Sequence, residues 1–485
     1  MPRLAQKATQ QPTGVLHVQL GCLIILSYLH FTSAAARVQA PASPVDSLLS
    51  QYAQHPHATA YGNDLVAALQ FMDVDLVRST APLFRILENS TVPVYPIGFS
   101  IPPEYVRAVV PAKAQALVTV IPGHPSTYKF KPRPDSTPTQ LAALEREYYA
   151  DMERSLFGLT WKKGGWECMR HLELLAAGCT PLFTDVEDVP AGAVAFLPKR
   201  VLAKVLRFPG VEALAGVPGS PSGDGKLNVT INMPRIDPIL YSLTVTALLE
   251  YTRRYLTTPA MAGHLLTTMG IQPPPCSGEN ESTTFRRSQL RTFLRRRRPP
   301  APGHVAGYYP SLTTNRACRT APICVLYLSS PDYPGADYMT DTLVHGLVTL
   351  LGPDSVTQHP RRDILYTTPA LLYETKRAPA RAGQYGIGFS YANTLFDMRD
   401  AGLTPADAVS TANARVQAAI AAHEFDVVIF GQVHRGPPPI METACKVYAP
   451  SKIAAVHGGD TPPSNAELQT YAACAGYYFA REAWR

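Results

Sequence analysis

The sequence predicts an α/β fold in which two parallel-sheet units are joined by a linker rich in proline and arginine. Two observations lead to this prediction. Runs of apolar and β-branched residues alternate with helical patterns along most of the chain, and one stretch, residues 273–317, has neither pattern. The chain has 485 residues and 46% apolar content, which is enough for two or three domains with hydrophobic cores.

The alternation divides the chain into five expected segments. They are a signal peptide or signal anchor (1–40), a lead-in segment (41–90), a first α/β unit (91–272), the linker (273–317) and a second α/β unit (318–485).

The N-terminal segment has an apolar run, Val18 to Phe31, between two basic residues (Arg3 and Lys7) and a stretch of small residues. This order is typical of a secretory signal, and the run is shorter than the ~20 residues that cross a bilayer. A cleaved signal, a type II membrane anchor and a buried helix remain open. The first two place the chain in the secretory pathway, in the lumen of the ER or Golgi. Three Asn-x-Ser/Thr triplets fit a luminal glycoprotein: Asn89, Asn228 and Asn280.

The eight cysteines do not form a metal or redox motif, because no Cys-x-x-Cys occurs. One of them lies in the N-terminal run, and the remaining odd number excludes complete pairing. Cys318 and Cys324 are close enough in sequence to pair across a short loop. Apolar surroundings predict buried thiols for Cys168, Cys179 and Cys445.

Positive charge is concentrated in the predicted linker. The net charge of the chain is +7, and seven arginines lie between residues 286 and 298. The rest of the chain is close to neutral, and the run LRRRRPP lacks the interleaved aromatic residues of single-strand binding surfaces. An arginine run of this kind is typical of a nucleic-acid patch, a solvated linker or a processing site. We expect one of the latter two and no nucleic-acid partner.

The elements of the lead-in and first unit follow from periodicity, β-branched content and turn residues. Gly178 is expected to end a helix, as glycine commonly does. The expected strands are 115–123, 155–160, 180–186 and 194–198, and the expected helices are 63–72, 136–156, 166–177 and 238–255.

The second unit repeats the alternation of strands and helices. Its apolar runs predict buried strands, and its longer periodic segments predict helices. The expected strands are 323–330, 425–431 and 451–459, and the expected helices are 340–351 and 405–423.

A basic, glycine-rich loop follows the strand at 155–160. Lys162 and Lys163 supply positive charge, and Gly164 and Gly165 let the backbone approach a ligand. In open parallel sheets, ligands bind beyond the carboxyl ends of the strands, where helix N-termini favour anions. The loop therefore predicts a site for a phosphate group.

The helix after this loop carries polar residues at helical spacing. Glu167, Arg170 and His171 share one face, and Glu173 lies on the neighbouring face. Arg170 suits phosphate oxygens, and a carboxylate suits a sugar or ribose hydroxyl. Spacing alone favours surface ion pairs, which contribute about 0.2–0.5 kcal/mol each.

The pattern Arg-His-x-Glu-x-x-Ala-x-Gly-Cys-x-Pro-x-Phe, from Arg170 to Phe183, resembles the donor-binding half of exostosin-like glycosyltransferases. More broadly it is similar to a segment of sugar transferases with two Rossmann-like domains (GT-B). The resemblance covers about residues 92–200. It implies that Glu173 contacts the ribose or sugar, that Arg170 faces the diphosphate, and that Gly178 and Pro181 shape the turn into the next strand.

The second unit carries further candidates at predicted strand ends and on one helix. Asp341 and His345 are spaced as an acid–base pair, or alternatively as a helix-dipole partner and a packed residue. His434 and Arg435 follow one strand, and a second strand is followed by His457 and Gly458. The catalytic candidates are Asp341, His345 and His434, and the expected residues of the second-domain cleft are Arg435, His457 and Gly458.

Several enzyme classes are disfavoured, because the chain has no Gly-x-Ser-x-Gly, Walker A or His-Glu-x-x-His motif and no suitably placed Asp-x-Asp. The activity that the resemblance implies is transfer of a sugar from a nucleotide-sugar donor to a glycan or glycoconjugate, without a metal or other cofactor. The alternative is a secreted or membrane-tethered carbohydrate- or nucleotide-binding protein of the same fold. It stays open because the donor-like half comes first and Glu167 and Glu173 are not spaced as Glu-x7-Glu.

Overall fold

A computed structural model gives the structure of the chain. It describes residues 52, 60–88, 90–120, 130, 138–213, 229–272, 323–329, 337–367, 395–396, 405–438 and 440–484. The chain divides into two compact units, Met1–Pro56 and His57–Arg485, and every helix and strand named below belongs to the second. The predicted N-terminal signal, the three glycosylation triplets, Cys318 and the linker lie outside the described residues.

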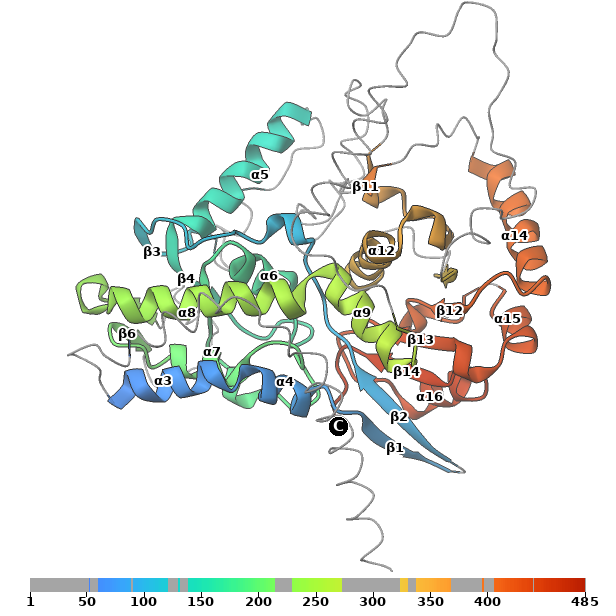
Figure 1. Ribbon diagram of the computed structural model, residues 1–485, viewed down its shortest axis with the longest axis horizontal. Coiled ribbons are helices and arrows are strands. Elements are labelled where there is room, and N and C mark those ends of the chain that lie inside the picture. Colours follow the sequence, from blue (N-terminus) through green and yellow to red (C-terminus); the bar gives the residue numbers. More distant parts are fainter. Residues whose placement is uncertain are drawn as a thin grey trace, which may run out of the picture. The chain divides into compact units, whose positions relative to one another are not determined.

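The fold is mixed α/β and contains a seven-stranded sheet that is parallel except for its first pair (Figure 1). The strands in the middle of this sheet are buried on both faces, which explains why they are apolar throughout instead of alternating. In spatial order they are β1 (Leu83–Leu87), β2 (Ser90–Pro96), β14 (Tyr477–Ala480), β13 (Ile453–His457), β12 (Val427–Phe430), β8 (Val325–Leu328) and β9 (Val356–His359).

The direction of winding reverses between β8 and β12. From β8 the chain passes to its neighbour β9 on one side, and then returns to β12, β13 and β14 on the other. In open parallel sheets, ligands commonly bind at such a reversal, beyond the carboxyl ends of the two strands. The helices of this region are α12 (Tyr338–Leu351), α14 (Pro405–Ala421), α15 (Met441–Val447) and α16 (Asn465–Ala472).

Two strands of this sheet come from the N-terminal part of the chain. Strand β2 pairs in parallel with β14 and in antiparallel with β1. The sequence assigned residues 41–90 to a lead-in and 91–272 to the first unit, whereas hydrogen bonding joins β1 and β2 to the C-terminal strands. Hydropathy locates a strand but carries no information about its partner.

A second parallel sheet has three strands, in the order β3 (Gln115–Leu117), β4 (Ser155–Thr160) and β5 (Thr180–Phe183). Residue Gly178 has φ +65°, and the helix before it ends there as predicted. The accompanying helices are α5 (Pro138–Glu153), α6 (Met169–Ala176), α7 (Lys199–Val205) and α8 (Pro238–Tyr251).

The remaining elements are short strand pairs and helices. The described elements not yet named are α3 (Ala60–Gln70), α4 (Met72–Ser79), α9 (Thr258–Thr268), the antiparallel pair β6 (Val211–Ala213) and β7 (Val229–Ile231), and the parallel pair β10 (Tyr366–Thr367) and β11 (Leu395–Phe396).

Most of the predicted elements are confirmed, with boundaries that differ by a few residues, and one expectation needs correction. Residues 194–198 form a buried turn, and Val194 has φ 49°, so the predicted strand there was wrong. Apolar content at these residues reflects burial, which a turn can require as much as a strand does. The predicted helix 238–255 is confirmed, because helix α8 ends at Tyr251 and Thr252–Leu256 continue it as a π-helix.

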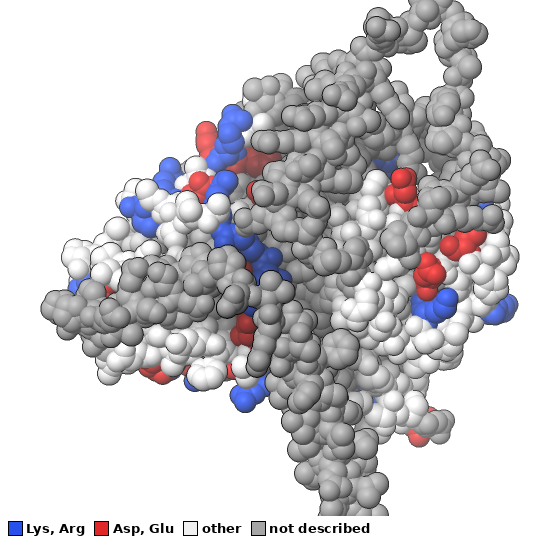
Figure 2. Space-filling model, viewed as in Figure 1, with Lys and Arg blue, Asp and Glu red and all other residues white. Residues whose placement is uncertain are grey.

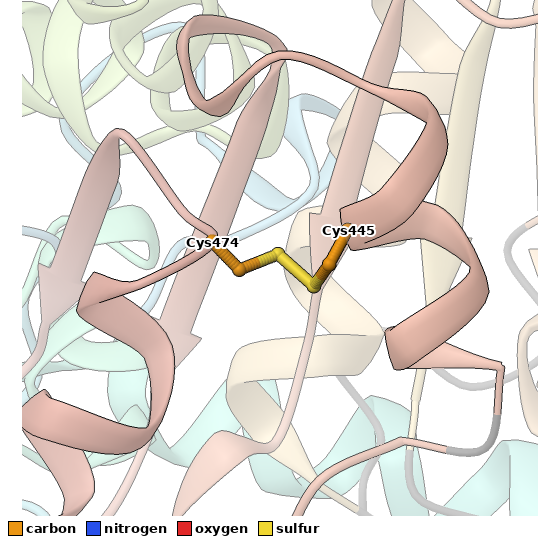
Figure 3. The surroundings of a disulfide bond; sticks show 2 residues. All are labelled: Cys445 and Cys474. Carbon is orange, nitrogen blue, oxygen red and sulfur yellow. A yellow bond between two sulfur atoms is a disulfide. The ribbon is translucent and has the colours of Figure 1, made fainter.

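The cysteines follow the prediction in part. Cys168 and Cys179 are free thiols, as expected, but only Cys179 is buried, and Cys168 is partly exposed. Cys445, predicted as a thiol, forms a disulfide with Cys474 across a Cα–Cα distance of 5.3 Å (Figure 3). The bond ties α15 to the residues after α16, and the sequence separation of 29 hid this pairing from the sequence. Cys324 is disulfide-bonded.

Helices α9 and α12 cross at a glycine and pack side by side (Figure 1). A Cβ atom at Gly346 would lie 2.0 Å from the carbonyl oxygen of Thr258, so no other residue fits without moving a helix. The Thr258 hydroxyl also bonds Nδ1 of His345 at 2.8 Å. This packing fixes the helix whose N-terminus lies at the carboxyl edge of the large sheet.

Candidate functional site

The glycine loop, residues 161–166, follows β4 directly and exposes two lysines. The ammonium group of Lys162 lies 4.7 Å from the ring centre of Trp166, and that of Lys163 lies 4.8 Å from the ring centre of Trp161. Both indole rings are largely buried, whereas both lysines are exposed. Cation–π contact of this kind orients an ammonium group and leaves it accessible to an anion.

The glycines of this loop touch residues that follow β13 and β14. A Cβ atom at Gly164 would lie 2.5 Å from a carboxylate oxygen of Asp460. At Gly165 it would lie 2.7 Å from Oε1 of Glu482 and 3.0 Å from Nη2 of Arg481. The glycines are therefore needed for close packing between loops at the carboxyl ends of two sheets, whereas the sequence had suggested room for a ligand.

Arg481 joins these loops and is 1% exposed. Its guanidinium donates to the carbonyl oxygens of Gly458 at 3.2 Å, Gly459 at 2.9 Å and Glu167 at 2.9 Å, and it also pairs with Asp460. Such a saturated guanidinium holds backbone segments together. It directly follows β14, and sequence reasoning missed it, although the strand-end argument that identified His434 applies to it as well.

Glu482 completes the junction and is also fully buried. Its carboxylate accepts hydrogen bonds from the backbone N–H of Trp166 at 2.8 Å and from the indole N–H of Trp484 at 2.9 Å. Burial raises the pKa of this carboxyl, while Arg481 opposes the shift. Arg481 and Glu482 therefore hold the backbone of Trp166 and Glu167 just before the start of helix α6.

Glu167 lies on the other side of Arg481. Its carboxylate accepts a hydrogen bond from the backbone N–H of Phe99 at 3.0 Å. Burial raises the pKa of Glu167 to about 8, and Arg481 opposes the rise. The group is 4% exposed and serves the same junction.

His171 points into the core beneath β4 and β5. Its Nε2 bonds the Thr160 hydroxyl at 2.9 Å, and its ring lies 4.5 Å from that of Phe183. Burial lowers the pKa of His171 to about 4, so the imidazole is neutral at pH 7. The predicted donor-binding histidine is fully buried.

Arg170 and Glu173 meet at one aromatic side chain. The guanidinium donates to the carbonyl oxygen of Val120 at 3.1 Å and lies 5.8 Å from the ring centre of Tyr148. The hydroxyl of Tyr148 donates to Glu173 at 2.5 Å. The two residues that resemble a donor site are thus held together at the carboxyl end of the three-stranded sheet.

Asp341 and His345, which were predicted as an acid–base pair, each bond to a different partner. Asp341 accepts from Nε of Arg362 at 2.8 Å, and burial raises its pKa to about 6 although Arg362 opposes the rise. His345 bonds Thr258. Both residues are at most 2% exposed and lie within the packing of α12, where Asp341 stabilises a buried cation.

His434 and Arg435 lie against the N-cap of α12. Nε2 of His434 is 3.8 Å and Nε of Arg435 is 3.5 Å from the carboxylate of Asp337. Nδ1 of His434 accepts from the backbone N–H of Gly458 at 3.2 Å. Burial lowers the pKa of His434, which favours the neutral imidazole.

His457 is the counterpart of His434 on the neighbouring strand, and the two rings lie 5.3 Å apart. Its Nδ1 accepts from the backbone N–H of Gly459 at 3.3 Å. Burial lowers the pKa of His457 to about 4. The two histidines therefore shape the Gly458–Gly459 turn that Arg481 binds from the other side.

The described residues show neither a metal cluster nor a bilayer-crossing helix. Within them no three His, Cys, Asp or Glu side chains are grouped to hold a metal, and no helix is both long and apolar enough to span a membrane. On the face shown in Figure 2, Lys and Arg are interspersed with Asp and Glu and form no single basic surface.

Comparisons with protein-family models, with curated proteins and with solved structures gave no match to this chain.

Proposed function

We propose that the chain is a glycosyltransferase of the two-Rossmann-domain type, acting in the secretory pathway on a nucleotide-sugar donor and a glycan or glycoconjugate acceptor. One observation carries the proposal. The loop that ends β4 contacts the residues that end β13 and β14, so the ligand-binding edges of two parallel sheets meet. Such an arrangement suits a transferase that brings two substrates together.

In this proposal the donor diphosphate binds at the edge of the three-stranded sheet. Lys162 and Lys163 are exposed there, and Arg170 lies at the end of β3. These cations would stabilise the charge that develops on the leaving diphosphate, and such electrostatic stabilisation usually contributes most to the rate of group-transfer reactions. Glu173, which the resemblance assigns to a ribose or sugar hydroxyl, is 5% exposed and accepts from Tyr148, so it would act by positioning Tyr148 beside Arg170.

Of the three catalytic candidates, His434 fits best, because Asp341 and His345 are buried with partners of their own. The His434 imidazole is neutral at pH 7, as a general base must be. Asp337 lies near Nε2 and would stabilise the imidazolium formed after proton uptake. Uptake at Nδ1 requires the bond from Gly458 to open.

Thermal denaturation of the full chain with UDP, GDP, ADP and CMP tests the donor site. Ligand at 100 times its dissociation constant stabilises by about 2.7 kcal/mol. The shift is expected to disappear when Lys162 and Lys163 are both replaced by alanine. It should persist in Lys452→Ala, which removes an exposed lysine just before β13, at the opposite sheet edge.

A non-catalytic carbohydrate- or nucleotide-binding protein is the second candidate. It is favoured by the engagement of every predicted base: Asp341 with Arg362, His345 with Thr258, and Nδ1 of His434 with Gly458. An assay for release of the nucleoside diphosphate separates the two. Binding without turnover, unchanged by His434→Asn, would support this second candidate against the transferase.

A further inference from the structure

Two polar side chains that the site above does not use follow β8 and β12, where the strand order of the large sheet reverses. Ser329 directly follows β8, and Gln432 lies two residues after the end of β12. The backbone N–H of Gly431 donates to the carbonyl oxygen of Leu328 at 2.7 Å, so the two strand exits are adjacent. This is the point at which the winding of the sheet reverses.

Both side chains are buried and unsatisfied. Ser329 is fully buried and Gln432 is 1% exposed. In the described part of the chain, the Ser329 hydroxyl and both polar atoms of the Gln432 amide have no hydrogen-bond partner. Native proteins pair nearly all such groups with protein, water or a ligand.

The backbone of Gln432 adds a second departure from ordinary structure. Its φ of 55° places it in the left-handed region, which residues other than glycine rarely adopt. Such strain persists where surrounding structure enforces it, and it is concentrated at ligand sites. Here it turns the chain so that His434 and Arg435 reach Asp337 at the N-terminus of α12.

Nearby charges are already balanced, which indicates the kind of ligand. Asp337 lies beside Arg435, and Asp341 is bound by Arg362. A hydroxyl and an amide both donate and accept hydrogen bonds without a net charge. The complementary ligand is therefore neutral and offers donors and acceptors on adjacent atoms, as the hydroxyl groups of a sugar ring do.

We propose that Ser329 and Gln432 bind a sugar ring of the acceptor glycan at the carboxyl ends of β8 and β12. The inference rests on the proposed transferase function and names the acceptor side of the same reaction. It places the acceptor next to His434, which follows Gln432 by two residues and is the best-placed candidate base.

The test is a printed array of neutral oligosaccharides, probed with the full chain, followed by titration of the retained glycan. Ser329→Ala and Gln432→Met each remove hydrogen bonds at nearly constant volume, and each should weaken binding roughly tenfold or more. The matched control is Ser100→Ala. This serine is also fully buried and, within the described residues, also lacks a partner, but it follows β2 instead of β8.

Stability measurements on the same variants separate a ligand site from ordinary structure. A serine with structural partners should lose stability on replacement, as expected for Ser155, which donates to Asp151 and accepts from Gln115. Ser329→Ala and Gln432→Met should leave the unfolding midpoint unchanged or raise it. A loss comparable to that of Ser155→Ala would show that a permanent water or protein group satisfies these atoms, and would overturn the proposal.

The remaining outcomes are also decisive. Retention of no glycan by the wild-type chain, or equal retention by all variants, overturns the inference. Glycan binding that depends on Ser329 and Gln432, with no response to any nucleotide, upholds it while removing the transferase function. A nucleotide response without glycan binding supports the donor site of the transferase and overturns the acceptor-site inference.

Discussion

Two cationic segments follow buried strands at carboxyl edges, and they have opposite roles in the structure. Lys162 and Lys163, after β4, are exposed, and their ammonium groups contact only indole rings within the described part of the chain. Arg481, after β14, is buried and bound to three backbone carbonyl oxygens. The number of fixed acceptors around a cation, more than its position after a strand, decides whether it is available to a ligand.

The largest expected effect comes from removing the buried cation. Arg481→Met leaves three carbonyl oxygens without their donor and removes the cation beside the buried carboxylate of Glu482. We expect a loss of about 3–5 kcal/mol in the free energy of unfolding, measured by urea denaturation, because a broken buried pair leaves an uncompensated charge. Lys162→Met should change it by at most about 0.5 kcal/mol. Equal effects of the two variants would remove the contrast between these segments.

The second effect concerns the disulfide that supports the large sheet. Replacing Cys445 and Cys474 together by alanine removes a cross-link between residues 29 positions apart. The unfolded chain gains freedom, so we expect a loss of about 3 kcal/mol in a denaturant titration. Replacing the free, buried Cys179 by alanine is the control, and it should cost less because no cross-link is lost. A smaller loss from the double variant than from the control would show that the bond does not stabilise this region.

The third effect lies at the contact between the two segments. Gly165→Ala places a Cβ atom against Glu482 and Arg481, which are buried and fixed, and should cost about 1–3 kcal/mol. Gly164→Ala meets Asp460, whose side chain is 64% exposed and can move at the cost of its ion pair with Arg481, so it should cost less. Thermal unfolding of the two variants gives the comparison, and a larger cost at Gly164 would contradict the described packing.

The sequence located most of the elements because burial on both faces leaves a strong signal. The strands Val325–Leu328 and Val427–Phe430 are apolar throughout and were predicted within a few residues. Pairing was not predictable in the same way. Strand β2 pairs with β14, and Cys445 forms a disulfide with Cys474. Each bond joins two segments whose local sequence patterns carry no information about each other.

The residues of the candidate site also differ in how far the sequence could predict them. The sequence identified Lys162, Lys163 and Arg170 from charge and position, because these properties are local. It missed Arg481, Glu482 and Ser329, each of which comes directly after a buried strand or one residue later. Burial decides what those residues do, and burial depends on which loops meet. A systematic reading of the residues after every buried strand would have found all three.

The smallest effect is the pH dependence of the buried histidine beside the glycine loop. The folded pKa of His171 is about 4, below the unfolded value of about 6.5, so the unfolded state binds the proton more readily. Stability is complete above pH 6.5 and is lost as pH falls toward 4. At pH 5.5 this histidine alone should account for about 1 kcal/mol of loss.

His171→Phe removes this titration and retains the contact with Phe183. The difference in unfolding free energy between the variant and the wild type, followed from pH 7 to pH 5, should shift in favour of the variant as pH falls. A difference that stays constant would mean that His171 titrates normally and that the core beneath the glycine loop admits water. The loop that carries Lys162 and Lys163 would then pack on a mobile core, in contrast to the fixed surroundings of Arg481.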